Sequence, residues 1–132
     1  MSQLEYFTAL SALWIALAWV PYILDRIMVR GLMGALANPS PEATPQSEWA
    51  VRAMAAHKVA VEAFVAFGPL AVLAMMRMPE DSYSGVLAMT FFIGIFAHYW
   101  IYVLGIVVLR TLSFALAALS TVALGLRAFG II

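Results

Sequence analysis

The sequence contains no cysteine and few charged residues. Without cysteine, disulfides, thiolate metal sites and a cysteine nucleophile are excluded. Only 11% of the 132 residues are charged and 65% are hydrophobic, whereas soluble domains contain about 25% charged residues. So few charges cannot cover a small domain, because its surface is large relative to its volume. Together with a mean hydropathy of +0.98, this predicts that most of the surface faces lipid.

A net charge of either sign is also absent. The seven basic and seven acidic residues cancel, so no basic patch indicates a nucleic-acid partner. The two histidines, His57 and His98, do not have the spacing of a metal or haem ligand pair. The sequence therefore predicts neither nucleic-acid binding nor a metal site.

The apolar residues are arranged in segments that are long enough to cross a membrane, which takes about 20 residues. The first segment has its arginines after the apolar run, unlike a signal peptide, and Pro21 can kink it near its end. Residues 38–48 contain three prolines and form a polar loop. Residues 85–132 are too long for one span and must reverse near Gly105 or Arg110. We predict one all-α, four-helix membrane domain over residues 1–132, with spans at about 4–29, 49–76, 84–105 and 109–130.

Basic residues are distributed unequally between the two ends of these spans. Four spans place both termini on one side and loops one and three on the other. Only Arg77 and Arg127 lie on the terminus side, whereas the loop side receives Arg26, Arg30, Arg52, Lys58 and Arg110. By the positive-inside rule, we expect a multi-pass protein with loops one and three in the cytoplasm and both termini opposite.

Charged side chains inside the second predicted span need an explanation, because each costs about 2.5–3.5 kcal/mol near the membrane centre. Lys58 and Glu62 are spaced i, i+4 and can pair. The pair either neutralises itself for insertion or marks a functional interior. His57 lies off the stripe that carries Glu62 and is interpreted as a hydrogen-bonded structural residue. That stripe consists of Arg52, Ala55, Val59, Glu62 and Ala66.

The third and fourth spans add further polar groups. His98 and Tyr102 share a helix face and could bind a ligand or form an interhelical hydrogen bond. Arg110 is either a topology signal or a ligand-binding cation. A small anionic ligand with an amine would suit the whole set, and glutathione is such a molecule. The set comprises the cations Arg26, Arg52, Lys58 and Arg110, the acceptor Glu62, and the donors His98 and Tyr102.

Two sequence blocks resemble the MAPEG family, the membrane-associated proteins in eicosanoid and glutathione metabolism. Residues 48–67, with Arg52, Ala56-His57 and Glu62, are similar to the family's second helix. Residues 97–114 are similar to its junction between the third and fourth helices. The resemblance implies a left-handed four-helix protomer, a homotrimer, and glutathione bound between adjacent subunits. The positions that match the family's pocket are Arg52, Glu62, His98, Tyr102 and Arg110.

The resemblance also implies roles for individual residues. Glu62 would bind the glutathione ammonium, and Arg110 would stabilise the thiolate, since a nearby cation lowers the pKa of a thiol. Arg26 or Arg30 would occupy the position of the family's first-helix arginine.

The chain departs from the family pattern at three positions. Ala55 replaces the second arginine of a pair, Val59 replaces an asparagine, and Val65 replaces a proline. Ala55 and Val59 lie on the stripe that should face glutathione, so a cation and an amide are missing there. Lys58 could replace the cation, although it points about 60° away from Ala55.

The resemblance implies a glutathione-dependent transferase or peroxidase that acts on lipophilic electrophiles from the bilayer. One alternative is a non-catalytic or differently liganded member of the family, which Ala55 and Val59 favour. A second alternative is a small multidrug-type antiporter. Antiporters of that type carry their glutamate in the first helix, where this chain has only Glu5.

Overall fold

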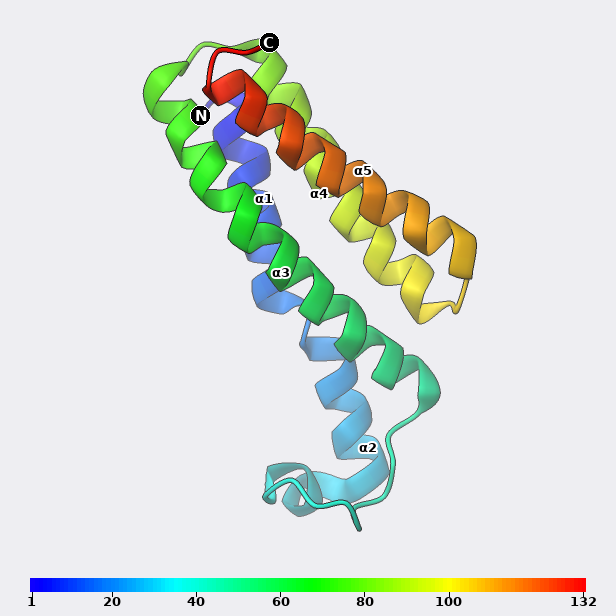
Figure 1. The fold of residues 1–132 in the computed structure, drawn as a ribbon. Helices are drawn as coiled ribbons and strands as arrows, with labels where there is room; N and C mark the ends of the chain where they lie inside the picture. The colour runs from blue at the N-terminus through cyan, green and yellow to red at the C-terminus, as the bar shows by residue number, and fades with distance from the viewer.

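The computed structural model describes all 132 residues and contains five helices. They are α1 (Gln3–Leu17), α2 (Val20–Leu36), α3 (Glu48–Arg77), α4 (Ser82–Val103) and α5 (Val107–Ala128). The segment Gln3–Leu36 and the helices α3, α4 and α5 are each long and apolar enough to cross a membrane. Both chain termini lie at one end of the bundle (Figure 1), which we name the terminus end. The opposite end, with residues 37–47 and 104–106, is the loop end.

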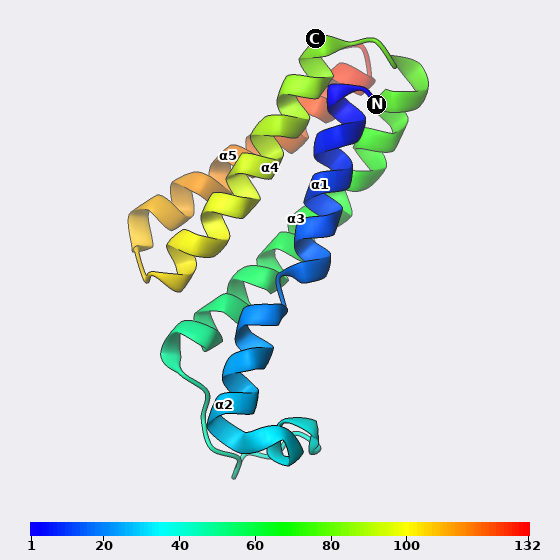
Figure 2. The ribbon, with the colours of Figure 1, turned by 180° about the vertical axis from the view of Figure 1, so that it is seen from behind.

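The outside of the bundle is largely apolar. Only 26 of 132 residues are buried, and most of the large hydrophobic side chains on the helices are exposed. Inside, α1 packs against both α3 and α4 (Figure 2), and Phe67 of α3 stacks on Phe91 of α4 with ring centroids 3.9 Å apart. The inner face of α3 carries small residues that let its neighbours approach closely: Ala50, Ala53, Ala56, Ala60, Ala71 and Ala74. The exposed apolar outside of the bundle is a surface that lipid or another protein chain covers.

The first span is not the single helix 4–29 that the sequence predicts. It is interrupted at Ala18 and Trp19, and α2 then continues to Leu36. Pro21 lies in the first turn of α2, where its missing N–H leaves no intrahelical bond unmade. The break frees backbone carbonyls, and side chains of other helices bind them. Tyr99 Oη donates to the carbonyl of Ala18 at 2.8 Å, so the break is held by the tertiary structure.

A buried carboxylate fixes the polar loop to α2. Asp25 is 5% exposed, and its Oδ1 accepts a bond of 2.5 Å from Ser47 Oγ. Asp25 Oδ2 also accepts from the backbone N–H of Ser47 and from Gln46 Nε2. Ser47 could have capped α3 with its own side chain, but its hydroxyl is bound to Asp25 and makes no capping bond. The start of α3 is therefore positioned by a residue 22 positions earlier in the chain.

The α4–α5 hairpin turns at residues 104–106, two residues before the predicted boundaries. Gly105 has φ +78, which favours glycine, and so supplies the tight reversal. Arg110 belongs to the first turn of α5 instead of the corner. Further from the turn, Gly94 of α4 lies against α5, and a Cβ added to it would be 2.9 Å from Ala117. This close approach joins the two helices that carry the predicted polar residues.

An ion pair closes the terminus end. Arg127 on α5 donates to both carboxylate oxygens of Asp81, at 3.1 and 2.8 Å. Ser84 also donates to Asp81, from its hydroxyl and its backbone N–H. The hydrogen bonds from Arg127 and then from Ser84 hold the pKa of the Asp81 carboxyl well below its usual range.

Candidate functional site

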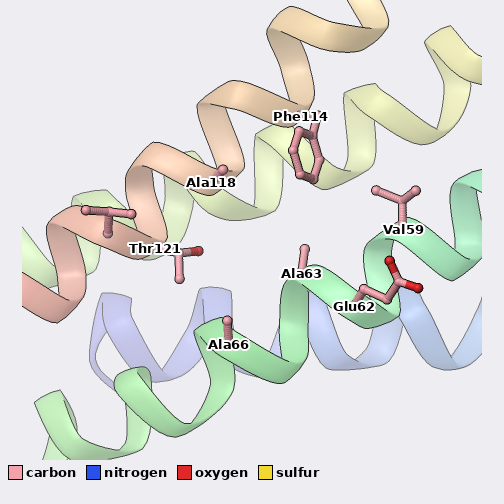
Figure 3. Close-up of a pocket in the computed structure, with 8 residues that line it drawn as sticks. Val59, Glu62, Ala63, Ala66, Phe114, Ala118 and Thr121 are labelled. Atoms are coloured by element: carbon pink, nitrogen blue, oxygen red, sulfur yellow. The ribbon is translucent and has the colours of Figure 1, made fainter.

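A groove runs along the outer side of the bundle between α3 and α5. Its volume is about 320 Å³. Figure 3 shows Phe114 and Thr121 of α5 pointing toward α3, with Ala63 and Ala66 of α3 facing them. Ala66 is itself exposed, so the groove opens onto the surface that faces the bilayer or a partner subunit. The full lining is Val59, Glu62, Ala63, Ala66, Phe114, Ala118, Thr121 and Val122.

A second and more polar cavity, of about 270 Å³, lies nearer the loop end. We name it the polar cavity. It is lined by His98 and Tyr102 of α4, by Arg110 and two neighbours on α5, and by one residue of α3. His98 and Tyr102 are one helical turn apart, as the sequence predicts, with ring centroids separated by 5.5 Å. The full lining is Val59, His98, Tyr102, Arg110, Thr111 and Phe114.

The groove and the polar cavity adjoin, because Val59 and Phe114 line both. A ligand in the groove would meet apolar and small side chains along α3 and α5. At the loop end it would then meet an imidazole, a phenol and a guanidinium. The combined site thus has a polar end and an apolar end, and Val59 is at the junction.

Arg110 is the main cation of the polar cavity. Its guanidinium carbon lies 4.4 Å from the centroid of the Tyr102 ring, within the range of a cation–π contact. No hydrogen bond or ion pair within the chain uses this guanidinium, so all five of its N–H donors are free for a ligand. The Tyr102 ring thus positions the Arg110 guanidinium, and the N–H groups of the guanidinium stay free.

Arg52 lies at the same end of the bundle. Its Nε donates to the backbone carbonyl of Val103 at 3.0 Å, at the corner between α4 and α5. This bond joins the start of α3 to the hairpin that carries Arg110. The terminal nitrogens of Arg52 form no hydrogen bond within the chain and are free to bind a ligand.

Lys58 and Glu62 lie on the outer surface of α3. Lys58 Nζ is 4.0 Å from Glu62 Oε1, and the two side chains are 79% and 66% exposed. Glu62 lines the groove, whereas Lys58 lines neither the groove nor the polar cavity. The predicted pair forms, but it is loose and leaves both charges available to other groups.

The arginines of the first segment are bound to the polar loop. Arg26 Nε donates to Gln46 Oε1 at 3.1 Å, and Arg30 Nε donates to the carbonyl of Thr44 at 2.7 Å. Neither arginine lines the groove or the polar cavity of this chain. The structure therefore brings together His98, Tyr102 and Arg110, places Glu62 beside them, and leaves Arg26 and Lys58 apart.

Both ring nitrogens of His57 are hydrogen-bonded inside the bundle. His57 Nε2 donates to the carbonyl of Ile15 at 2.8 Å, and Tyr22 Oη donates to His57 Nδ1 at 2.7 Å. A carbonyl can only accept, so the proton of the neutral ring lies on Nε2. Both nitrogens of His57 are thus engaged, as expected for a structural histidine. No cluster of His, Asp and Glu side chains in the chain could hold a metal ion.

Sequence reasoning missed Asp25 and the α5 side of the groove. Asp25 is a single acidic residue near the end of an apolar segment, with no signal that it anchors Ser47. Phe114, Ala118 and Thr121 follow Arg110 at intervals of three and four residues. This spacing places them on the face of α5 that carries Arg110. The sequence does not show which helix that face meets.

One comparison with known proteins identifies the family of this chain. A model described as the MAPEG family matches residues 4–130, which is nearly the whole chain. No curated protein and no solved structure matches the chain. The matched region includes every residue of the groove and the polar cavity, and all of the four candidate membrane spans except Gln3. The chain is therefore a multi-pass membrane protein that belongs to the MAPEG family.

Proposed function

We propose that this protein is a glutathione-dependent transferase or peroxidase that acts on lipophilic electrophiles. The carrying observation is the free guanidinium of Arg110, held over Tyr102 inside a polar cavity that adjoins an apolar groove. A cation beside a thiol favours the thiolate, which is the nucleophilic form. The family commonly uses glutathione, and the groove offers an apolar electrophile a path to the same place.

The residues present fit most of the glutathione molecule. The free nitrogens of Arg52 suit one of its two carboxylates. Lys58, on the outer surface of α3 next to Glu62, would have to bind the other carboxylate from outside the two cavities. The carboxylate of Glu62 suits its ammonium group, and the polar cavity would receive the sulfur. Tyr102 and His98 supply a hydroxyl and an imidazole for its polar backbone.

In the proposed reaction, the thiolate attacks an electrophilic carbon, or an oxygen of a peroxide. A sulfur–carbon or sulfur–oxygen bond forms as the bond to the leaving group breaks, and the leaving group takes the electron pair. Arg110 stabilises the negative charge on sulfur before the attack. The apolar part of the electrophile would lie between α3 and α5, against Ala63, Ala66 and Ala118.

We also propose that the working unit is a homotrimer. Glu62 is near the middle of a membrane-spanning helix and its side chain is 66% exposed. A carboxylate facing hydrocarbon is costly, so a ligand or another subunit must cover it. Arg26, which lies away from the cavities of its own protomer, could serve the site of a neighbour. Lipid would surround this trimer. We expect loops one and three to lie in the cytoplasm and both termini on the opposite side of the membrane.

The test is a titration of the purified protein with glutathione by calorimetry in detergent. We expect binding at millimolar concentration or below. Glu62→Gln should weaken binding at least tenfold, because a hydrogen bond to a charged group contributes about 1.5–3 kcal/mol. Glu42→Gln, in the exposed loop, is the matched control and should bind like the wild type. Absence of binding at millimolar glutathione would contradict the proposal.

Val59 favours a second candidate, a member of the family that binds another ligand or catalyses no reaction. It is an apolar residue at the junction of the groove and the polar cavity. There the family pattern has an asparagine, whose amide could hydrogen-bond a peptide group. Mass spectrometry of the protein purified without added glutathione distinguishes the two candidates. A co-purifying anionic ligand that glutathione fails to displace would support the second.

A further inference from the structure

His98 is a buried polar residue without a partner. It is 5% exposed, and neither of its ring nitrogens forms a hydrogen bond within the protomer, whereas both nitrogens of His57 do. The nitrogens of His98 are not among the fully enclosed side-chain atoms without a partner, which are Thr8 Oγ1 and Trp14 Nε1, so the imidazole opens into a cavity. Its ring lies beside Tyr102 and Phe114 and lines the polar cavity. The free nitrogen of His98 is thus available to a ligand in that cavity.

His98 is also the one side chain in the lining of the polar cavity that carries a basic nitrogen lone pair. The Arg110 guanidinium has no lone pair to offer, and the hydroxyls of Tyr102 and Thr111 are not bases at this pH. On the α3 side, the nearby groups are the Arg52 cation and the Glu62 carboxylate. In the proposed function, Glu62 is occupied by the ammonium of glutathione.

We propose that His98 is the proton acceptor of this site, a role that rests on the proposed glutathione chemistry. The S–H bond of the bound thiol breaks, the electron pair remains on sulfur, and a new N–H bond forms on His98. The thiolate then lies between the imidazolium and the Arg110 guanidinium. Its negative charge offsets the repulsion between the two cations. After the attack, the imidazolium returns the proton to the leaving group.

Comparing the amount of thiolate formed with the number of protons released on glutathione binding tests this role without measuring turnover. If His98 takes the proton, binding creates thiolate at pH 7 while little proton reaches the solvent. Thiolate is read from its ultraviolet absorbance, and proton release from the dependence of the binding enthalpy on the buffer. For wild-type protein we expect a strong thiolate signal with much less than one proton released per glutathione.

The variants are His98→Gln and His98→Ala. With either one, we expect glutathione to bind, the thiolate signal at pH 7 to fall at least tenfold, and the signal to return only at higher pH with release of a proton. Loss of a general base typically lowers the rate by 10²–10⁴-fold. Added imidazole should restore the signal in His98→Ala, which also shows that this variant is folded. Glu42→Gln, in the exposed loop and outside both cavities, is the control and should behave like wild type.

Two results would overturn the inference alone: an unchanged thiolate signal at pH 7 in both His98 variants, or release of one full proton by the wild type. Failure of wild-type protein to bind glutathione is a different result. It would refute the proposed function and the role of His98 together.

Discussion

The packing of α4 on α5 leads to a prediction about two glycines in similar helical settings. Gly94 on α4 and Gly125 on α5 are both buried in helix interiors. In a helix interior, alanine is ordinarily more favourable than glycine by up to about 1 kcal/mol, because glycine loses more backbone entropy. The same change to alanine should nevertheless have opposite effects at the two positions.

At Gly94 the new methyl group would meet atoms that cannot move aside. An added Cβ lies 2.9 Å from both the Cβ and the backbone nitrogen of Ala117, and 3.0 Å from the carbonyl oxygen of Ser113. Overpacking of this kind costs about 1–3 kcal/mol. Two of the three contacts are with backbone, so we expect the upper part of that range. After subtracting the helix-propensity gain, Gly94→Ala should lower the free energy of unfolding by about 1–2 kcal/mol.

At Gly125 the contact is with a flexible side chain. The nearest atom to an added Cβ is Leu70 Cδ1 at 3.3 Å, and leucine can change rotamer at small cost. Gly125→Ala should therefore leave the free energy of unfolding unchanged or raise it by up to about 1 kcal/mol.

The measurement is thermal unfolding of both variants in the same detergent, followed by circular dichroism. For a protein of this size, 1 kcal/mol corresponds to roughly 4 °C in Tm, so Gly94→Ala should unfold several degrees below Gly125→Ala. Gly94→Ala should also weaken glutathione binding, because Gly94 is one turn from His98 and its contact on Ser113 is close to Arg110. Equal Tm values, or a larger loss at Gly125, would refute the argument from close packing.

Three further predictions concern charged groups. Because the folded-state pKa of Asp81 is depressed, its bonds to Arg127 stabilise the protein fully above about pH 4, the ordinary carboxyl value. That stability should be lost as the pH falls further, and Asp81→Asn should flatten this acid limb in Tm scans. Asp25→Asn, at a buried carboxylate, should cost about 1–3 kcal/mol and speed proteolysis of the 37–47 loop, whereas Glu42→Gln should leave the cleavage rate unchanged. Lys58→Met should change the free energy of unfolding by less than about 0.5 kcal/mol, because its ion pair is exposed and 4.0 Å long; a larger loss in urea titrations would contradict this.

Much of the candidate site could be predicted from helical spacing, because spacing fixes which side chains share a face. His98 and Tyr102 are one turn apart on α4, as the spacing predicts, and the structure places both in the lining of the polar cavity; that they bind a ligand stays a prediction. The two hydrogen bonds of His57 also agree with the structural role expected for a residue off the stripe of α3. The family resemblance predicted from two sequence blocks is confirmed over residues 4–130.

Other features depended on contacts between distant segments. The sequence placed Arg26 and Lys58 with the site. In this chain Arg26 is bound to Gln46 and Lys58 lines neither cavity, so a binding role for them stays a prediction. The sequence predicts a kink at Pro21, whereas the structure interrupts the helix slightly earlier, at Ala18 and Trp19, where the apolar run is continuous. Bonds from Tyr99 and His57, far along the chain, support the freed carbonyls.

The scarcity of charge determined that this chain lies in a membrane, because no folding pattern could hide so much apolar surface from water. Length and apolar periodicity then determined four spans. Only the tertiary structure decided that the groove of α3 and α5 adjoins the polar cavity at Val59, and that His98 has no partner while His57 has two. The physical reason is that residue spacing along one helix fixes which side chains share a face, whereas the way the helices pack decides which faces meet.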